Sequence, residues 1–352
     1  MKNKNLLIGL VTLALIITLA ACGQQSSQTS ETPAQTTVAS VADEDKPSIV
    51  SNVQSVAGVP LLTLNNGTEV PQLGLGTQIQ SLEQDSSATG RKLLNDTTRE
   101  SVVAALQSGY RHLDTAHGYY NEEGVGQAIK ESGVPREEIW LTSKLWPSEY
   151  ENASQAIDEM LDRLQVDYID MVYLHHPTGD YLSAYRALEN AVREGKVRAI
   201  GISNFDNEPE IFEDIMENAE IQPQALQIEM HPFAQRLETR TLAEENDIQV
   251  EAWYPLGHAD PELLENEVLV EIAENHNKTV PQTILRWFMQ EGIATVPGST
   301  NPEHIAENID IFDFELSDDE IEQIRDLDKG EAGRYFNLDY DIMGIFFGNL
   351  DE

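Results

Sequence analysis

The sequence contains few basic residues and a single cysteine. Lys and Arg together number 22 against 61 Asp and Glu, which gives a formal charge of −39 over 352 residues. A polyanion repels phosphate unless a basic patch is concentrated locally, and the sequence has no such patch, so it excludes a general nucleic-acid-binding protein. Because Cys22 has no second cysteine to pair with, an intrachain disulfide and a Cys-ligated zinc site are excluded as well. We expect no metal.

The chain also lacks a typical transmembrane segment. Lys2 and Lys4 precede the apolar residues 6–21, a segment just under the ~17 residues usually needed to span a bilayer. A basic start before an apolar segment is typical of a secretory signal. The segment ends in Leu19-Ala20-Ala21-Cys22-Gly23, which resembles the bacterial lipoprotein signal, where cleavage before the cysteine leaves it diacylated.

The N-terminal segment is therefore predicted to be a targeting signal. We expect a signal peptide at residues 1–21 and a membrane anchor of two acyl chains, palmitate among them, at Cys22. The protein would then lie on the extracytoplasmic side of the cell membrane. An uncleaved anchor and a plain signal peptide remain alternatives.

Residues 22–58 contain no aromatic residue and are rich in Gln, Ser and Thr. Such a segment cannot bury enough apolar surface to offset the entropy lost on ordering. It is predicted to be a disordered tether of roughly 30 Å between the membrane and a folded domain at 59–352. At the start of that domain, Asn66-Gly67 lies between apolar segments and predicts a β-hairpin, because both residues accept positive φ.

Beyond the hairpin, short apolar segments alternate with amphipathic ones. Strands are expected at 73–77, 111–114, 139–143, 168–175, 197–202, 225–229, 249–254 and 293–297. Helices are expected at 98–108, 121–132, 151–164, 181–194, 206–218, 236–246 and 279–290. Eight strands alternating with helices indicate parallel strands with right-handed crossovers.

A closed (β/α)8 TIM barrel of ~250 residues fits this alternation, with the hairpin across the bottom of the barrel. A doubly wound open sheet is the alternative. It is disfavoured because no G-x-G-x-x-G follows the first strand.

Polar residues stand at the ends of successive predicted strands. Taken alone, each has an ordinary explanation: Asp114 as a helix cap, Tyr119 as a packed aromatic, Lys144 as a solvated cation, His175 as a structural histidine. Together they fall at the carboxyl ends of the strands, the face on which such barrels place their active sites.

The segments that carry these residues resemble signatures of the aldo-keto reductases, in the order of that family. They are Gly109-Tyr110-Arg111-His112-Leu113-Asp114-Thr115-Ala116-His117-Gly118-Tyr119-Tyr120-Asn121-Glu122, Thr142-Ser143-Lys144-Leu145-Trp146, Leu174-His175-His176-Pro177, Gly201-Ile202-Ser203-Asn204-Phe205 and Gln227-Ile228-Glu229-Met230-His231-Pro232. The likeness runs from about Val59 to the C-terminus, and the bacterial 2,5-diketo-gluconate reductases are the most similar branch. It implies a reductase that moves hydride from NADPH to a small carbonyl substrate.

The resemblance assigns roles to four residues. Tyr119 would give a proton to the carbonyl oxygen, with Lys144 beside it and Asp114 beside Lys144, while His175 would orient the carbonyl. A phenol has a reference pKa near ~10 and needs a neighbouring cation to become a usable proton shuttle, which Lys144 would supply. Asp114 would keep that lysine protonated and in place. Because the nicotinamide supplies the hydride, no metal is required.

The resemblance also implies binding residues. The cofactor would be held by Thr77, Ser203, Asn204, Gln227, Trp253, Leu256, Gly257, Ser299, His304, Glu307 and Asn308. The substrate pocket would be walled by His175, Trp146, Tyr120, His176 and Arg334-Tyr335-Phe336. Tyr120 and Phe336 could equally be core packing. The apolar part of the 340–352 tail, Ile345-Phe346-Phe347, could fold over the pocket.

Two departures from the family pattern stand out. Gly298 and His304 occupy the positions where a Lys and an Arg usually grip the 2′-phosphate of NADP. A neutral histidine does not reproduce a bidentate arginine contact, so the preference for NADP over NAD is expected to be weakened. The second departure is residues Ser81–Asn95, which are predicted to be an insertion beside the cofactor channel.

Other functions remain open from the sequence. A lipid-anchored protein could be a tethered nucleotide or small-molecule binder on a reductase fold, or a subunit that regulates a partner. The acidic composition suggests halotolerance, although solubility outside the cell explains it as well. No coiled-coil stripe is visible, and many members of the family act as monomers, so we expect a monomer.

Overall fold

The computed structural model describes residues 52–336. The predicted signal peptide at 1–21, Cys22, the tether as far as residue 51 and the 340–352 tail lie outside the described residues. Residues 52–58, which the sequence assigns to the tether, pack against the barrel instead. The Asn52 N–H donates to the Glu137 carbonyl at 2.8 Å, and the Val53 side chain is buried in an apolar cluster. These contacts assign residues 52–58 to the folded domain rather than to the tether.

Eight parallel strands form the barrel in chain order. They are β3 (Leu75–Gly76), β4 (His112–Asp114), β5 (Trp140–Leu145), β6 (Ile169–Leu174), β7 (Val197–Ser203), β8 (Ala225–Glu229), β9 (Gln249–Trp253) and β10 (Ala294–Thr295). Parallel bridges Leu73↔Thr295 and Gly76↔Gly298 join the first strand to the last and close the sheet. The predicted (β/α)8 barrel is confirmed, and the open doubly wound sheet is wrong.

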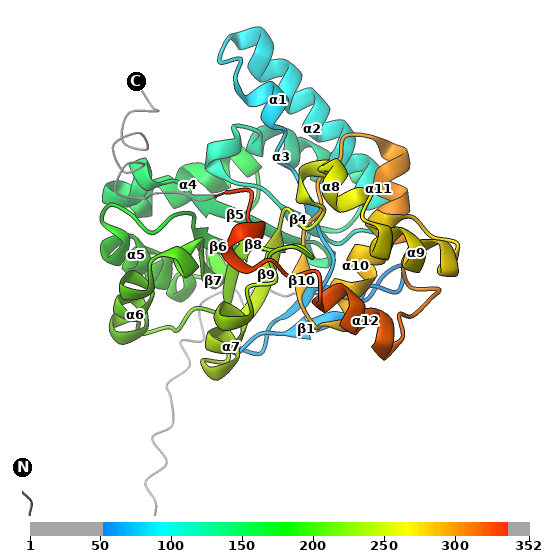
Figure 1. Ribbon diagram of the computed structural model, residues 1–352. Helices are drawn as coiled ribbons and strands as arrows, with labels where there is room; N and C mark the ends of the chain where they lie inside the picture. The colour runs from blue at the N-terminus through cyan, green and yellow to red at the C-terminus, as the bar shows by residue number, and fades with distance from the viewer. Residues whose placement is uncertain (1–51, 337–352) are drawn as a thin grey trace, which may run out of the picture. The chain divides into compact units, whose positions relative to one another are not determined.

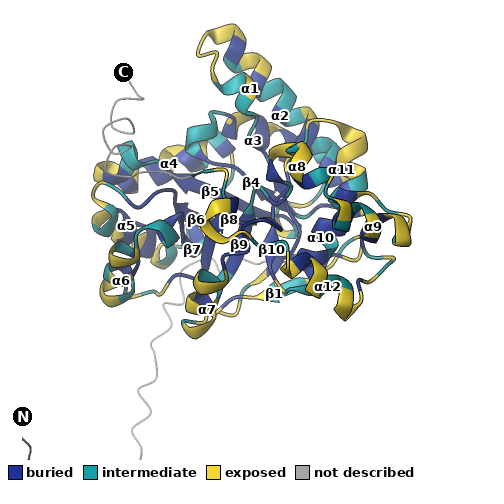
Figure 2. Cartoon of the chain, in the orientation of Figure 1, coloured by how far each residue is buried: buried dark blue, intermediate teal, exposed yellow. Residues whose placement is uncertain are grey.

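Helices surround the strands (Figure 1). Seven match the predicted helices: α2 (Ala88–Ser108), α3 (Glu122–Ser132), α4 (Ala153–Leu164), α5 (Tyr181–Arg193), α6 (Pro209–Asn218), α7 (Leu237–Glu245) and α10 (Val280–Gln290). Five more were not predicted: α1 (Gln80–Glu83), α8 (Pro261–Leu264), α9 (Glu267–His276), α11 (Pro302–Ile309) and α12 (Asp318–Arg325). Their buried faces point to the strands and their exposed faces point outward (Figure 2), as amphipathic periodicity requires.

The predicted hairpin pairs β1 (Leu61–Thr63) with β2 (Glu69–Pro71) in antiparallel fashion. Gly67 takes a positive φ of 81°, whereas Asn66 does not. The Asn66 side chain instead donates from Nδ2 to the Arg198 carbonyl in β7, and Asn65 donates to the carbonyls of Pro223 and Asp247 before β8 and β9. These contacts fasten the hairpin to the amino ends of the strands, opposite the face that carries the site.

Residues 81–95, the predicted insertion, form most of α1 and the start of α2. The helix begins at Ala88 rather than at residue 98 because the Ser87 side chain caps it, accepting a hydrogen bond from the Gly90 N–H at 3.1 Å. This extension projects at the top of the view in Figure 1. The insertion therefore lengthens a barrel helix at the loop that follows β3.

Candidate active site

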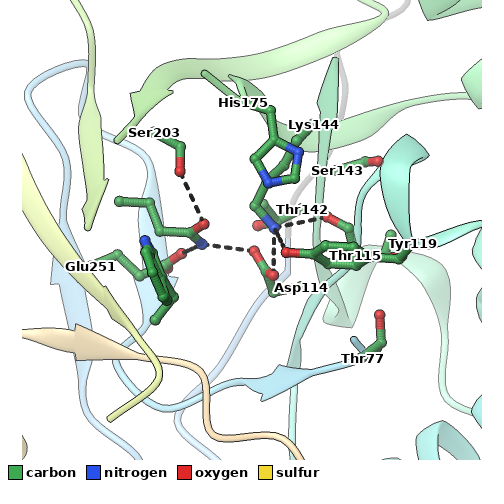
Figure 3. Close-up of polar contacts among 12 residues, drawn as sticks. Thr77, Asp114, Thr115, Tyr119, Thr142, Ser143, Lys144, His175, Ser203 and Glu251 are labelled. Atoms are coloured by element: carbon green, nitrogen blue, oxygen red, sulfur yellow. Dashed lines mark hydrogen bonds and ion pairs between the residues drawn. The ribbon is translucent and has the colours of Figure 1, made fainter. Parts of the chain in front are cut away.

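A buried lysine connects the residues that the sequence singled out. Asp114 ends β4, Lys144 lies in β5, and Tyr119 ends the short 3₁₀ turn His117–Tyr119 that follows β4. Lys144 Nζ donates to Asp114 Oδ1 at 2.6 Å and to the Thr115 carbonyl at 3.0 Å, and it lies 3.3 Å from Tyr119 Oη (Figure 3). Asp114, Thr115 and Tyr119, at or just after the end of β4, thus share the cation that β5 supplies.

Tyr119 is held in its protonated form. Burial raises the pKa of Tyr119 well above its usual value of 10, and the charges of Asp114, Glu83 and Glu251 add to this. The phenol therefore carries its proton at neutral pH, as a proton donor must. Once the proton leaves, the neighbouring ammonium group of Lys144 stabilises the phenolate that remains.

His175 directly follows β6 and is neutral. Burial lowers its pKa well below 6.5, and repulsion from His176, Lys144 and His117 lowers it further. A neutral imidazole has one N–H donor and one acceptor nitrogen. The Nδ1 atom is buried without a hydrogen-bond partner among residues 52–336. The ring lies edge-on to Tyr119, with centroids 5.7 Å apart.

Two aromatic neighbours hold the His175 ring. It stacks on His176 with centroids 4.5 Å apart and 5° between the planes, and Trp146 meets it edge-on at 5.0 Å. Burial lowers the pKa of His176 to about 3, so the stacked pair does not bring two positive charges together.

A cavity of about 990 Å³ runs from Asp114 and Tyr119 past β9 and β10 to α11. Seven of the predicted cofactor residues line it: Thr77, Trp253, Leu256, Ser299, His304, Glu307 and Asn308. Trp253 on its wall is an aromatic platform, and together with the Tyr119 phenol it would suit the nicotinamide end of a dinucleotide. Gly298 and His304 both lie on its wall. None of the described residues that line the cavity is a Lys or an Arg.

The other four predicted cofactor residues do not line the cavity but support it. Asn204 Oδ1 accepts from the Trp253 indole N–H at 3.0 Å, and its Nδ2 donates to the His175 carbonyl at 2.9 Å. Gln227 Nε2 donates to Asp114 Oδ2 at 2.8 Å, and Ser203 Oγ lies 3.5 Å from Gln227 Oε1. These contacts tie the aromatic platform to the proton-donating end.

Gly257, the fourth of them, serves through its backbone. It takes a positive φ of 57°, and a Cβ there would lie 2.7 Å from Leu263 and 2.9 Å from the Tyr335 hydroxyl. A side chain at this position would push apart the loop after β9 and the C-terminal segment.

Only some of the residues predicted to wall the substrate pocket lie around His175. Trp146 packs on it, as noted. Tyr120 lies under the Arg91 guanidinium of α2, 3.8 Å from the ring centroid, so its ring faces the insertion. Phe336 lies 5.3 Å from Trp253 and 4.9 Å from Tyr254 between ring centroids, while the Tyr335 N–H donates to Glu229 at 2.6 Å. The C-terminal segment is thereby anchored beside the aromatic platform.

Some lining residues were missed by the sequence reasoning. Gln78, Gln80, Tyr254 and His258 border the cavity, and the Gln80 side-chain amide donates to the Tyr254 hydroxyl across it. The insertion was predicted to lie beside the channel, but Gln80 precedes it and nothing in the sequence marks Gln80 as a contact. Glu251 was also missed, although a charged residue two positions before Trp253 in a buried strand is a detectable signal.

Between residues 52 and 336, no three His, Cys, Asp or Glu side chains are grouped so that they could hold a metal ion. In the same part of the chain, no helix has the length and apolar character needed to cross a membrane.

Known proteins are similar to this chain in fold and in sequence. The chain is 46% identical over 271 residues to the glyoxal reductase of Bacillus subtilis, covering 76% of this chain and 92% of that protein. It is 41% identical over 272 residues to the 9,11-endoperoxide prostaglandin H2 reductase of Trypanosoma cruzi, covering 76% and 91%. Its fold matches a Bombyx mori aldo-keto reductase solved with NADP at a TM-score of 0.71 and 31% identity, covering 80% and 96%.

A solved aldo/keto reductase from Brucella melitensis matches as well, with a TM-score of 0.69 and 41% identity over 77% of this chain and all of that one. The sequence model of the aldo/keto reductase family matches residues 72–329, which is most of the barrel. The closed eight-stranded barrel and the sequence matches agree: this chain belongs to the aldo/keto reductase family, the oxidoreductases that act on carbonyl and CH–OH groups with a nicotinamide cofactor.

Proposed function

We propose that the chain reduces small aldehydes and ketones, with Tyr119 as the proton donor and Lys144, Asp114 and His175 assisting it. One observation carries this proposal: Lys144 Nζ lies within 3.3 Å of both Asp114 Oδ1 and Tyr119 Oη in a buried site. A binding protein has no need of a buried ammonium–phenol pair, whereas a proton donor does. The relatives named as glyoxal and prostaglandin reductases support a carbonyl substrate.

Each residue then has a defined task. His175, neutral and with a free ring nitrogen, orients the substrate carbonyl next to the phenol. Tyr119 releases its proton to the carbonyl oxygen, and Lys144 stabilises the resulting phenolate. Asp114 fixes Lys144 through the 2.6 Å ion pair. When bound along Trp253, a reduced nicotinamide supplies the hydride that the carbonyl carbon accepts.

We also infer that the site accepts NADH as well as NADPH. At the adenosine end, His304 is exposed on α11 and Gly298 offers no side chain, so an arginine–phosphate pair cannot form. Comparing kcat/KM for the two cofactors tests this inference. A several-hundred-fold advantage for NADPH would overturn it.

The residues before the barrel support a further part of the proposal, namely that Cys22 is lipidated and holds the enzyme at the outer side of the cell membrane, as a monomer. The motif around Cys22 carries it. Labelled palmitate should be incorporated by the full chain and not by Cys22→Ala. Equal labelling of both chains would contradict the anchor.

Tyr119→Phe tests the catalytic assignment. The change removes the proton and leaves the ring, so carbonyl reduction should fall at least a hundredfold, since a positioned acid contributes ~10²–10⁴-fold. Nucleotide binding should persist, because the Trp253 platform is unchanged. The measurement is NADPH and NADH oxidation with a panel of small aldehydes and ketones, alongside nucleotide titration. Turnover retained in the variant would contradict the assignment, and binding without turnover in the unsubstituted chain would favour a tethered binding protein.

A further inference from the structure

The barrel interior holds a second acidic side chain next to the proposed catalytic group. Glu251 lies in the middle of β9, and its side chain is 4% exposed. The ionisable and polar groups that face it come from four other strands: His112 and Asp114 from β4, Lys144 from β5, Tyr173 from β6 and Gln227 from β8. Figure 3 shows Glu251 on the opposite side of Asp114 from Tyr119.

Glu251 and Asp114 share one amide group. Gln227 is the partner of Glu251 in the β8–β9 register, and its Nε2 donates both to Asp114 Oδ2 and to Glu251 Oε1. A side-chain amide nitrogen has two hydrogens, so both are used. The Gln227 carbonyl oxygen is thereby turned away from the carboxyl groups, toward Ser203 Oγ.

The other oxygen of Glu251 faces His112. His112 Nδ1 lies 3.0 Å from the Pro71 carbonyl, which can only accept, so Nδ1 carries a proton. Its Nε2 lies 3.3 Å from Thr142 Oγ1 and 3.6 Å from Glu251 Oε2, and the second separation is too long for a hydrogen bond. The Tyr173 hydroxyl hydrogen-bonds to Glu251. Burial raises the pKa of Glu251, His112 opposes this rise and Asp114 reinforces it. Glu251 is therefore held by Gln227 and Tyr173.

We propose that Glu251 is a positioning residue of the reductase site. It sets the orientation of the Gln227 amide, so that the NH2 group supports Asp114 and the carbonyl oxygen is left to Ser203. This inference rests on the proposed function. Without an acceptor at Glu251, one Gln227 hydrogen loses its partner and the amide is free to rotate, which weakens its support of Asp114 on the wall of the nucleotide cavity.

Two single substitutions of Glu251 distinguish the effect of side-chain length from the effect of charge. Glu251→Asp keeps the charge but withdraws the oxygens from Gln227, whereas Glu251→Gln keeps an oxygen for Gln227 and turns an NH2 group to His112 Nε2. We expect E251D to raise the Kd of both NADH and NADPH about tenfold and to lower kcat, and E251Q to stay within about twofold of the unsubstituted chain. Nucleotide titration by quenching of tryptophan fluorescence gives Kd without turnover.

Glu189→Asp is the matched control. Glu189 is a buried carboxylate of α5 that accepts from the Glu220 and Ile221 N–H groups, far from the nucleotide cavity. It should lose stability on shortening without a change in Kd. An E251D variant that behaves like this control, losing stability alone, would overturn the inference and leave the proposed function intact. An E251Q variant as impaired as E251D would also overturn the inference, because the charge of Glu251 and not the position of its oxygens would then matter. Failure of the unsubstituted chain to bind either nucleotide would overturn both proposals.

Discussion

Desolvation moves the pKa of Tyr119 and that of His175 in the direction that keeps each residue uncharged. For the phenol this direction is upward from 10, and for the imidazole it is downward from 6.5. Both pKa shifts widen the pH range over which the Tyr119 phenol is protonated and the His175 ring is neutral. The same low-dielectric surroundings strengthen the Lys144–Asp114 ion pair that fixes the cation.

A broad pH optimum follows from these two shifts. Protonation of His175 needs a pH well below 6.5, and loss of the Tyr119 proton needs a pH above 10, so neither group titrates between these values. The kcat/KM for reduction of a non-hydrating ketone should therefore be flat from about pH 6.5 to 10. Circular dichroism at each pH checks that the chain remains folded. A titration of kcat/KM centred near pH 8 would show that one of the two assignments is wrong.

At the scale of elements, close helix contacts place the loop that carries Tyr119. Gly124 in the first turn of α3 would bring a Cβ to 2.4 Å from the Asn95 carbonyl of α2. Asn95 in turn accepts from the Gly124 N–H at 2.7 Å and donates to the Tyr120 carbonyl at 3.2 Å. The insertion helix is thus joined to the backbone just after the proposed proton donor.

Gly124→Ala should destabilise the chain although alanine is the better helix former. The gain in helix propensity is ~1 kcal/mol, whereas overpacking against a main-chain carbonyl costs ~1–3 kcal/mol. A 2.4 Å approach to a main-chain oxygen puts the cost in the upper part of that range. We therefore expect a net loss of up to about 2 kcal/mol in the free energy of unfolding, measured in urea. Gln127→Ala, at an exposed position of the same helix, is the control and should change little. A Gly124→Ala variant as stable as this control would show that α2 and α3 move apart at no cost.

The elements could be predicted from the sequence because their periodicity is strong. Strands 225–229 and 197–202 differ from β8 and β7 by one residue at most, since buried parallel strands are short apolar segments. The start of α2 at Ala88 was missed because residues 81–95 are polar and lack an apolar stripe. The proposed proton donor and its cation were identified because they follow strand ends in a known pattern. The Gln80–Tyr254 and Gln227–Glu251 contacts were not, because they depend on which side chains of different elements the fold brings together.

At the scale of the whole molecule, charge is the dominant feature. Ion pairs are frequent at the surface, such as Arg193–Glu220 and Lys196–Asp158. Even if every Lys and Arg were paired, the net charge of −39 would remain as unpaired carboxylates. Exposed ion pairs contribute at most ~1 kcal/mol each and weaken when screened. Repulsion among the excess carboxylates acts in the opposite sense and is also relieved by screening, so the balance favours stabilisation by salt.

The melting temperature should therefore rise with NaCl concentration. Screening is nearly complete when the Debye length falls to ~3 Å at 1 M, so most of the rise should occur below about 0.5 M. This shape distinguishes screening from exclusion of salt from the protein surface, which continues to raise Tm at higher concentrations. Differential scanning calorimetry from 10 mM to ~2 M NaCl measures it, with sucrose as a control that stabilises without screening. A Tm that is flat or falls over this range would show that the surface ion pairs outweigh the repulsion, and that the acidic composition serves solubility alone.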